Sequence, residues 1–227
     1  MTATQRPRFK SIIFDVDSTL SGIEGIDWLA SLRGEAEARE SAELTERAME
    51  GKIPIEEIYT RRLAAIRPTG LELIALAHEY QSAMQPGARE LIAELRTARC
   101  QVHLLSGGLR TAIVPFAMQL GVRAENVHAV SLTTDADGTF SLLDGEQLLA
   151  TQVGKPTVVH RLQLPGPVVM VGDGSTDAAV RGVVDTFIAY TGVARREQVI
   201  AVADAEASDF TLLRALLFEP SARVTRV

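Results

Sequence analysis

Three carboxylates of the chain directly follow apolar segments that are typical of buried strands. Asp15 and Asp17 come after residues 11–14, and Asp173 comes after residues 168–171. If these strands are parallel neighbours, their carboxyl ends meet at one edge of a sheet, where ligands of open α/β sheets bind. Crowded carboxylates repel one another, so a hard cation with oxygen ligands, such as Mg²⁺, is the natural counter-charge. One carboxylate beside bound phosphate could be a nucleophile, and a second could give and take protons.

Groups suited to an anion follow a third apolar segment. Ser106 and Gly107 stand between the apolar run 102–105 and a predicted helix at 109–120. Backbone N–H groups and the dipole at a helix N-terminus favour an anion. Lys155, at the start of another predicted helix, adds a positive charge. The two sets of residues together predict phosphoryl transfer to a carboxylate and then to water.

The elements that must position these residues alternate between strand and helix. This alternation predicts an α/β fold whose core is a doubly wound, Rossmann-like parallel sheet. Residues 22–83 differ, because their apolar residues recur at helical spacing and predict a helical-bundle cap inserted after the first strand. The core then comprises residues 1–21 and 84–227. The strands are expected at 11–14, 102–105, 127–131, 168–171, 186–189 and 210–211, with a final helix after the last of them.

A second, smaller flap is predicted near residues 131–148. Asp137 and Gly138 form a dipeptide that favours a two-residue hairpin turn between short alternating runs. We expect this hairpin to lie close to the site.

The order of these chemical groups resembles the four motifs of the haloacid-dehalogenase-like (HAD) phosphatase superfamily. Among its branches, the chain is most similar to the phosphoserine phosphatases. The motifs occur in the family's order and span most of the chain. They are Asp15-Val16-Asp17-Ser18-Thr19, Ser106, Lys155 and Gly172-Asp173-Gly174-Ser175-Thr176-Asp177.

The resemblance implies a Mg²⁺-dependent phosphomonoester hydrolase that converts O-phospho-L-serine to L-serine and phosphate through an aspartyl-phosphate. Asp15 would be the nucleophile and Asp17 the acid and base. The other implied roles are Mg²⁺ binding by Asp15, the Asp17 backbone carbonyl and Asp173; phosphate binding by Ser106, Gly107 and Lys155; and support of Lys155 or a metal-bound water by Asp177.

The inserted segment carries the implied choice of substrate. Residues 20–27 resemble the family's entry into its cap, where Glu24 matches a glutamate that meets the substrate's ammonium group. Arg62 matches the arginine that binds the carboxylate, and Arg61 is the alternative if the helix register differs by one. Met49 would line the apolar wall.

Two positions depart from the family's pattern. Ile55 stands where the family's wall usually carries phenylalanine, and Thr176 stands where the last motif usually carries an asparagine that contacts substrate or phosphate. Thr176 can donate one hydrogen bond but lacks an amide. These departures leave open another small phosphomonoester, such as a phosphorylated amino alcohol or sugar, as the substrate.

Composition narrows the classes of protein that the chain could be. With 227 residues, 46% of them hydrophobic and 23% charged, it matches globular averages and excludes wholesale disorder. One cysteine, Cys100, excludes an internal disulfide. A net charge of −6 without a basic stripe argues against nucleic acid as a partner.

The same survey predicts where the protein works and with what. No apolar run reaches the length of a membrane helix, and the polar start of the chain argues against a signal peptide. We expect a cytoplasmic monomer or homodimer whose partner is a small-molecule phosphomonoester, with neither membrane nor nucleic acid. A catalytically idle binding module is the alternative from another class, and it is disfavoured because no catalytic carboxylate is missing.

Overall fold

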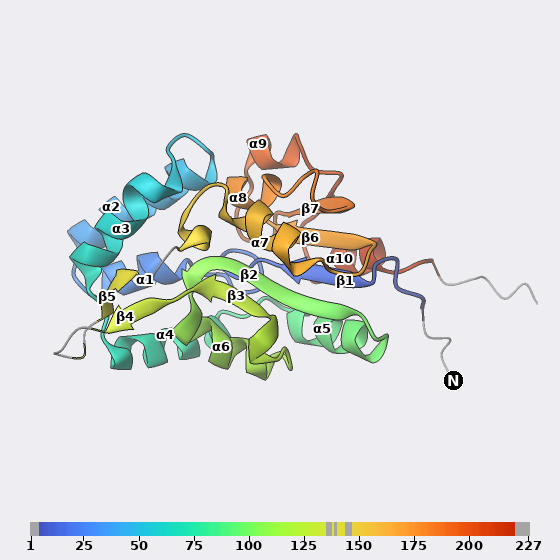
Figure 1. Ribbon diagram of the computed structural model, residues 1–227, viewed down its shortest axis with the longest axis horizontal. Helices are drawn as coiled ribbons and strands as arrows, with labels where there is room; N and C mark the ends of the chain where they lie inside the picture. Colours follow the sequence, from blue (N-terminus) through green and yellow to red (C-terminus); the bar gives the residue numbers. More distant parts are fainter. Residues whose placement is uncertain (1–4, 135–137, 139, 144–146, 221–227) are drawn as a thin grey trace, which may run out of the picture.

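A parallel β-sheet runs through the middle of the molecule (Figure 1). The computed structural model describes residues 5–134, 138, 140–143 and 147–220. Within those residues the sheet has six strands in the order β3-β2-β1-β6-β7-β8, and all neighbours are parallel. The predicted doubly wound α/β fold is therefore confirmed. The strands are β1 (Ser11–Phe14), β2 (Gln101–Leu109), β3 (Val127–Val130), β6 (Val168–Gly172), β7 (Thr186–Tyr190) and β8 (Ala205–Ala207).

Strand β1 lies at the centre of this sheet. All four of its residues are buried, as expected of a continuous apolar run that is covered on both faces. Phe14 pairs with Leu104 of β2 and with Val171 of β6. The backbone N–H of Asp15 donates to the carbonyl of Val171 at 2.9 Å. The residues that follow β1 and β6 therefore start from the same edge of the sheet.

Helices cover both faces of the sheet. The core helices are α5 (Ala88–Thr97), α6 (Arg110–Gln119), α7 (Gly154–Leu162), α8 (Ser175–Ala178), α9 (Glu197–Ile200) and α10 (Phe210–Leu217), with short 3₁₀ helices η1 (Ala124–Asn126) and η2 (Leu148–Ala150). Helices α5 and α6 lie on one face, and α7 and α8 lie on the other (Figure 1). The buried residues of α5, namely Ala88, Leu91, Ile92 and Leu95, form one apolar stripe. None of the described helices combines the length and apolar character that a membrane crossing requires.

Among the described residues, five helices lie between β1 and β2, and the first four of them belong to the inserted segment. These four are α1 (Gly25–Ser31), α2 (Glu35–Met49), α3 (Ile55–Ile66) and α4 (Gly70–Ser82). Figure 1 shows α2 and α3 on one side of the sheet and α4 on the other, beside α6. The ring of Tyr80 in α4 packs on Phe116 of α6, with centroids 5.7 Å apart. The division into a core and a cap at residues 22–83 stays a prediction, because α4 belongs to that segment yet packs on a core helix.

Strand β2 is longer than the predicted strand at 102–105. It continues through Ser106 and Gly107 to Leu109, and its pairing with β3 shifts register after Leu105. Glycines tolerate such a bulge, which re-aims neighbouring side chains. Ser106 and Gly107 therefore lie in an irregular strand end, and α6 begins after them at Arg110.

The predicted strand at residues 210–211 is wrong. The last strand of the sheet is β8, and Phe210 is the first residue of α10. The side chain of Asp209 accepts the backbone N–H groups of Thr211 and Leu212, both at 2.8 Å. This N-cap satisfies two donors that a helix start leaves without partners, and so it sets the start of α10.

The expected hairpin is present. Strands β4 (Leu132–Thr134) and β5 (Phe140–Leu143) pair antiparallel, and β5 lies next to α3. Gly138 has a φ of +81°, which glycine adopts at little cost. Asp137, the other residue of the predicted turn, lies outside the described residues.

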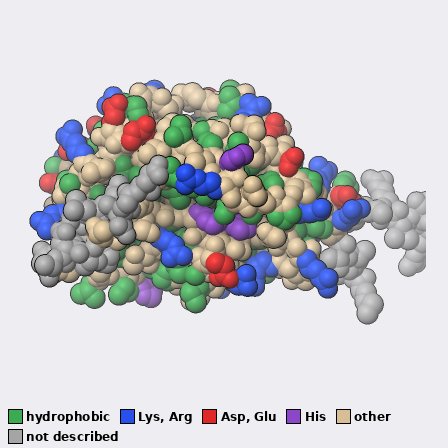
Figure 2. Space-filling model, viewed as in Figure 1, with side chains coloured by type: hydrophobic (Ala, Val, Ile, Leu, Met, Phe, Trp, Pro, Cys, Tyr) green, Lys and Arg blue, Asp and Glu red, His purple; other side chains and the backbone are tan. Residues whose placement is uncertain are grey.

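A pair of histidines joins β2 to the edge strand β3. His103 Nδ1 lies 3.2 Å from His128 Nε2, and their rings are stacked. Figure 2 shows histidine side chains grouped near the middle of this face. Burial lowers the pKa of His128 to about 4, and the charges of His103 and Arg110 act in the same direction. Burial also lowers the pKa of His103.

We expect this pair to make the fold sensitive to acid. A histidine in the unfolded chain has a pKa near 6.5. Between about pH 6.5 and pH 4, His128 is therefore protonated in the unfolded chain but neutral in the folded protein. The stabilisation is complete above that range and is lost as the pH falls through it. His128→Gln should remove about 1 kcal/mol of the stability lost between pH 7.5 and pH 5, which is about half of the full linkage value because solvent screens a partly exposed ring. Urea unfolding at pH 7.5 and pH 5 measures this difference.

The control for this measurement is the exposed His160, whose replacement by glutamine should leave the pH dependence unchanged. An equal acid sensitivity in parent and His128→Gln proteins would show that the pair does not stay neutral in the folded state.

Candidate active site

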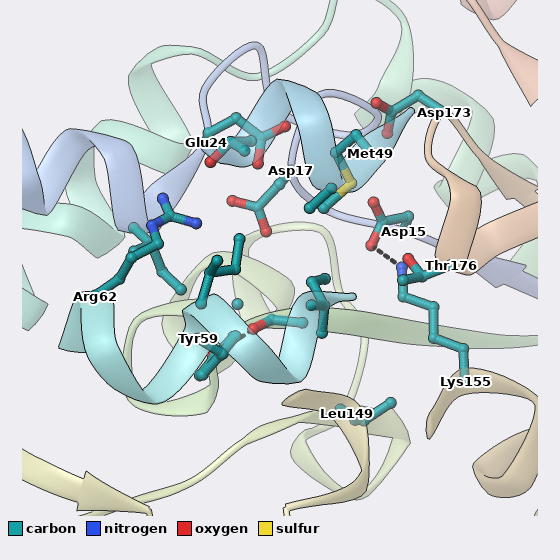
Figure 3. A pocket seen from close by; sticks show the side chains of 17 residues that line it. Asp15, Asp17, Glu24, Met49, Tyr59, Arg62, Leu149, Lys155, Asp173 and Thr176 are labelled. Atoms are coloured by element: carbon teal, nitrogen blue, oxygen red, sulfur yellow. Dashed lines mark hydrogen bonds and ion pairs between the residues drawn. The ribbon is translucent and has the colours of Figure 1, made fainter. Parts of the chain in front are cut away.

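A buried lysine joins two carboxylates at the carboxyl end of the sheet. Asp15 follows β1, Asp177 lies in α8, and Lys155 is in the first turn of α7. The Lys155 Nζ lies 2.8 Å from Asp15 Oδ1 and 2.5 Å from Asp177 Oδ1, and all three side chains are buried (Figure 3 shows the bond to Asp15). Burial works to lower the pKa of Lys155, but the two carboxylates outweigh it and raise this pKa. The ammonium group therefore stays charged.

Asp173 completes a cluster of three acidic side chains with Asp15 and Asp177, whose oxygens lie within 4.8 Å of one another. Thr19 donates to Asp173 Oδ1 at 3.0 Å, and the buried guanidinium of Arg196 binds Asp173 Oδ2. Burial raises the pKa of Asp173 to about 7, although Arg196 opposes this. Burial and the charge of Asp177 raise the pKa of Asp15 well above its usual range. The three carboxylates of this cluster outnumber the two cations that contact them, Lys155 and Arg196.

Asp17 is held apart from this cluster by three donors. Its Oδ1 accepts the backbone N–H of Gly25 at 2.6 Å and the hydroxyl of Tyr80 at 2.8 Å. Its Oδ2 accepts the hydroxyl of Ser106 at 3.0 Å. Burial raises the pKa of Asp17, while the Gly25 and Tyr80 bonds work against that rise. A Cβ atom at Gly25 would lie 2.0 Å from the Tyr80 hydroxyl, so this arrangement requires glycine.

The strand end at residues 106–108 approaches the carboxylates closely. The backbone N–H of Gly108 donates to Ser106 Oγ at 2.8 Å, and the carbonyl of Gly107 accepts the hydroxyl of Tyr59 at 2.5 Å. A Cβ atom at Gly108 would lie 2.8 Å from Asp17 Oδ2. Tyr59 lies in α3, so this bond ties an inserted helix to the strand end.

Glu24, which directly precedes α1, and Arg62, in α3, enter the site from the inserted segment. Glu24 Oε1 accepts the hydroxyl of Ser18 at 2.7 Å. Burial, and next the charge of Asp17, raise the pKa of Glu24 well above its usual range. Arg62 lines the central cavity, whereas Arg61 is largely exposed and pairs with Glu40 at 3.3 Å. The helix register therefore presents Arg62, and not Arg61, to the cavity.

One cavity is lined both by Asp15, Asp17 and Lys155 and by Glu24 and Arg62 (Figure 3). Ser106 and Asp177 contact lining residues through the bonds described above. The sequence-predicted residues that line the cavity are Asp15, Asp17, Glu24, Met49, Ile55, Arg62, Gly107, Lys155, Asp173 and Thr176. The others are Ile26, Thr45, Ala48, Ile58, Tyr59, Gly108 and Leu149.

Known proteins resemble this chain in sequence and in architecture. The family model for haloacid dehalogenase-like hydrolases matches residues 9–180, which is most of the chain. The chain is a haloacid dehalogenase-like hydrolase. Its family membership was predicted from the motifs and is confirmed.

The relatives of this hydrolase include phosphoserine phosphatases. The Bos taurus enzyme is 36% identical over 212 residues, covering 92% of this chain and 93% of the relative. The chloroplastic enzyme of Arabidopsis thaliana is 38% identical over 200 residues, covering 86% and 67%. A phosphoserine phosphohydrolase-like protein from Francisella tularensis superposes with a TM-score of 0.84 and 30% identity, covering 91% of this chain and 99% of that one. This hydrolase thus falls in the predicted phosphoserine phosphatase branch.

Sequence reasoning missed several residues of this hydrolase's site. Arg196 follows another arginine in a polar stretch, and nothing in that pattern separates a buried cation from a solvated one. Tyr59 and Tyr80 lie on helices whose buried faces could be assigned only after the packing was known. Both tyrosines are buried. Their positions on apolar helix faces allowed this burial but did not require it.

Proposed function

We propose that this protein hydrolyses O-phospho-L-serine to L-serine and phosphate. The observation that carries the proposal is the single cavity in which the Asp15, Asp17 and Lys155 group meets Glu24 and Arg62. The first three residues suit phosphoryl transfer, and the last two suit an ammonium and a carboxylate. The phosphoserine phosphatases among the relatives support the same substrate.

The chemistry starts at Asp15. Its carboxylate attacks phosphorus in line, and the bond from phosphorus to the serine oxygen breaks, leaving an aspartyl-phosphate. Asp17 protonates the departing serine oxygen. Water then attacks the aspartyl-phosphate and gives its proton to Asp17, so phosphate leaves and both carboxylates return to their starting states.

Lys155, Ser106 and Gly107 are proposed to hold the phosphoryl group. Lys155 already lies against Asp15, so its ammonium can follow the oxygens transferred to that carboxylate. The Ser106 hydroxyl now donates to Asp17 Oδ2. Rotation of this hydroxyl toward phosphate frees Oδ2, while Gly25 and Tyr80 keep Oδ1 in place. The oxygen released is the one we propose to exchange protons.

The acidic cluster fits a magnesium ion. All of its donors are carboxylate oxygens, the ligand type that Mg²⁺ prefers, and Asp15, Asp173 and Asp177 bring them within 4.8 Å of one another. We propose that Asp15, the backbone carbonyl of Asp17 and Asp173 hold the ion and that Asp177 supports Lys155 or a bound water. Bound there, Mg²⁺ would offset the charge repulsion between a carboxylate and a phosphate.

Recognition of the amino acid part is proposed for the inserted helices. Glu24 faces the ammonium group and Arg62 the carboxylate, because the guanidinium of Arg62 can donate charge-assisted hydrogen bonds to a carboxylate. Met49 forms part of the apolar wall, and Thr176 donates to the phosphate or the substrate. Met49 also touches the last motif, since a Cβ atom at Gly174 would lie 2.7 Å from its sulfur.

We expect L-phosphoserine to lead a panel of phosphomonoesters by at least about 100-fold in kcat/KM, because a site with paired polar groups rejects analogues that lack their partners. Glu24→Gln and Arg62→Ala should each lower that value by at least about 10-fold. Phosphate release with and without Mg²⁺ measures both effects.

A phosphorylated amino alcohol or sugar at the head of the panel would contradict the proposed substrate and would direct attention to Ile55 and Thr176. Unchanged kinetics in both variants would contradict the zwitterion site. Arg61→Ala is the matched control, because this neighbouring side chain is exposed and lies outside the central cavity.

A further inference from the structure

Asp27 gathers three donors beneath Arg62. Its Oδ1 binds the guanidinium Nη2 of Arg62 and also accepts the hydroxyls of Ser41 at 2.6 Å and Thr45 at 2.8 Å. Asp27 lies in α1, Ser41 and Thr45 in α2, and Arg62 in α3. Both members of the ion pair are largely buried, with side-chain exposures of 10% for Arg62 and 17% for Asp27. One carboxylate oxygen thus joins three inserted helices.

The bonds to Arg62 use one edge of its guanidinium. Nη2 reaches Asp27 and also Ser41 Oγ at 2.7 Å, and Nε donates to Ser41 Oγ at 3.1 Å. The Nε and Nη2 edge is therefore directed into α1 and α2. A guanidinium is a rigid planar fork, so fixing one edge fixes the direction of the opposite end. Figure 3 shows that the guanidinium lies on the side of the cavity where Glu24 and Asp17 are found.

Asp27 also counters a conflict of charge within the cavity. Glu24 and Asp17 are carboxylates that line the same cavity as Arg62. A long arginine side chain without an anchor could pair with either of them, and each such pair would occupy a group that the reaction needs. The bond to Asp27 already pairs the arginine's charge and holds its guanidinium, so Arg62 is less free to pair with Glu24 or Asp17.

We propose that Asp27, with Ser41 and Thr45, is the positioning group that sets the enzyme's preference for a substrate carrying a carboxylate. Asp27 itself does not line the cavity and acts through Arg62. This inference rests on the proposed function, because it gives Arg62 the carboxylate-binding role.

The test compares two substrates that differ in one group. O-Phospho-L-serine and O-phosphoethanolamine share the phosphate and the ammonium, but only the first has a carboxylate. For Asp27→Ala we expect KM for phosphoserine to rise at least about 10-fold with kcat changed by less than about 2-fold, whereas kcat/KM for phosphoethanolamine changes by less than about 2-fold. Asp27→Asn, which keeps the shape, and Ser41→Ala should show the same selective effect to a smaller degree.

The matched control is Glu40→Gln, because Glu40 pairs with the exposed neighbour Arg61. This variant should match the parent on both substrates. Thermal unfolding of each variant shows whether enough protein is folded for its kinetics to be compared.

The outcomes separate this inference from the function on which it rests. Equal losses on both substrates in all three variants, or no loss in any of them, would overturn the positioning role of Asp27. If Arg62→Ala raises KM for phosphoserine while the Asp27 variants do not, only this inference fails. If Arg62→Ala itself leaves phosphoserine kinetics unchanged, the proposed carboxylate site fails first.

Discussion

Asp15→Asn should abolish turnover while the protein stays folded. The amide is close to the carboxylate in shape, but it is a poor nucleophile and cannot form the acyl phosphate. Removing a covalent nucleophile lowers kcat by several orders of magnitude, so we expect a loss of at least about 10⁴-fold. The substitution also removes one of the raised-pKa carboxylates from a crowded cluster, which limits the cost to stability. Phosphate release and circular dichroism on the same preparation measure the two effects.

The control is Asp209→Asn, because asparagine caps a helix about as well as aspartate, and this cap belongs to α10. That variant should keep both activity and fold. A folded Asp15→Asn protein with more than about 1% of parental kcat would place the nucleophile elsewhere, since the expected loss is far larger.

Lys155→Met should damage both stability and activity. It leaves the buried carboxylates of Asp15 and Asp177 without the ammonium that now lies 2.8 and 2.5 Å from them. Breaking a buried ion pair from one side costs about 3–5 kcal/mol, and we expect a loss in free energy of unfolding of that order. We also expect kcat/KM to fall by at least about 10³-fold, because the charge that holds the phosphoryl oxygens is gone.

The pH dependence of the stability loss in Lys155→Met distinguishes loss of the ion pair from simple loss of packing. Without Lys155 the pKa of Asp15, which burial already raises, rises further, so protonation of Asp15 at low pH removes buried charge. The stability difference between parent and variant should therefore be larger at pH 8 than at pH 5. Urea unfolding at both pH values gives the comparison, and a difference that does not vary with pH would contradict the ion-pair explanation.

Residues that follow the central strands could be predicted from sequence because two independent signals agree on them. Asp15 and Asp173 each end a continuous apolar run, and parallel pairing brings the ends of such runs together. The position of Lys155 at the start of a predicted helix made it a candidate, and its resemblance to a family motif strengthened that choice, since a lone lysine at a helix start has no distinctive pattern. Glu24 and Arg62 were reached through the resemblance, and the choice between Arg62 and Arg61 required the helix register.

Residues whose position depends on packing between helices could not be predicted. The contact between Arg196 and Asp173 joins a loop after β7 to one after β6, and local sequence carries no trace of it. Tyr80 donates a hydrogen bond to Asp17 from α4, the inserted helix that packs on α6. The strand expected at residues 210–211 failed for a local reason, because the capping strength of Asp209 outweighed the apolar appearance of Phe210.

The central position of β1 has a consequence for how the protein is made. Phe14 ends β1 and Val168 begins β6, so one edge of the central strand has no partner until 154 further positions have been added. At about 5–20 residues per second, that wait on the ribosome is on the order of 8–30 s. During it an apolar strand edge is open to wrong pairing with other chains. Nascent chains that stop before β6 would carry the proposed nucleophile without the neighbouring strand β6 and without Asp173 and Asp177, which follow it, and so would be inactive and prone to aggregate.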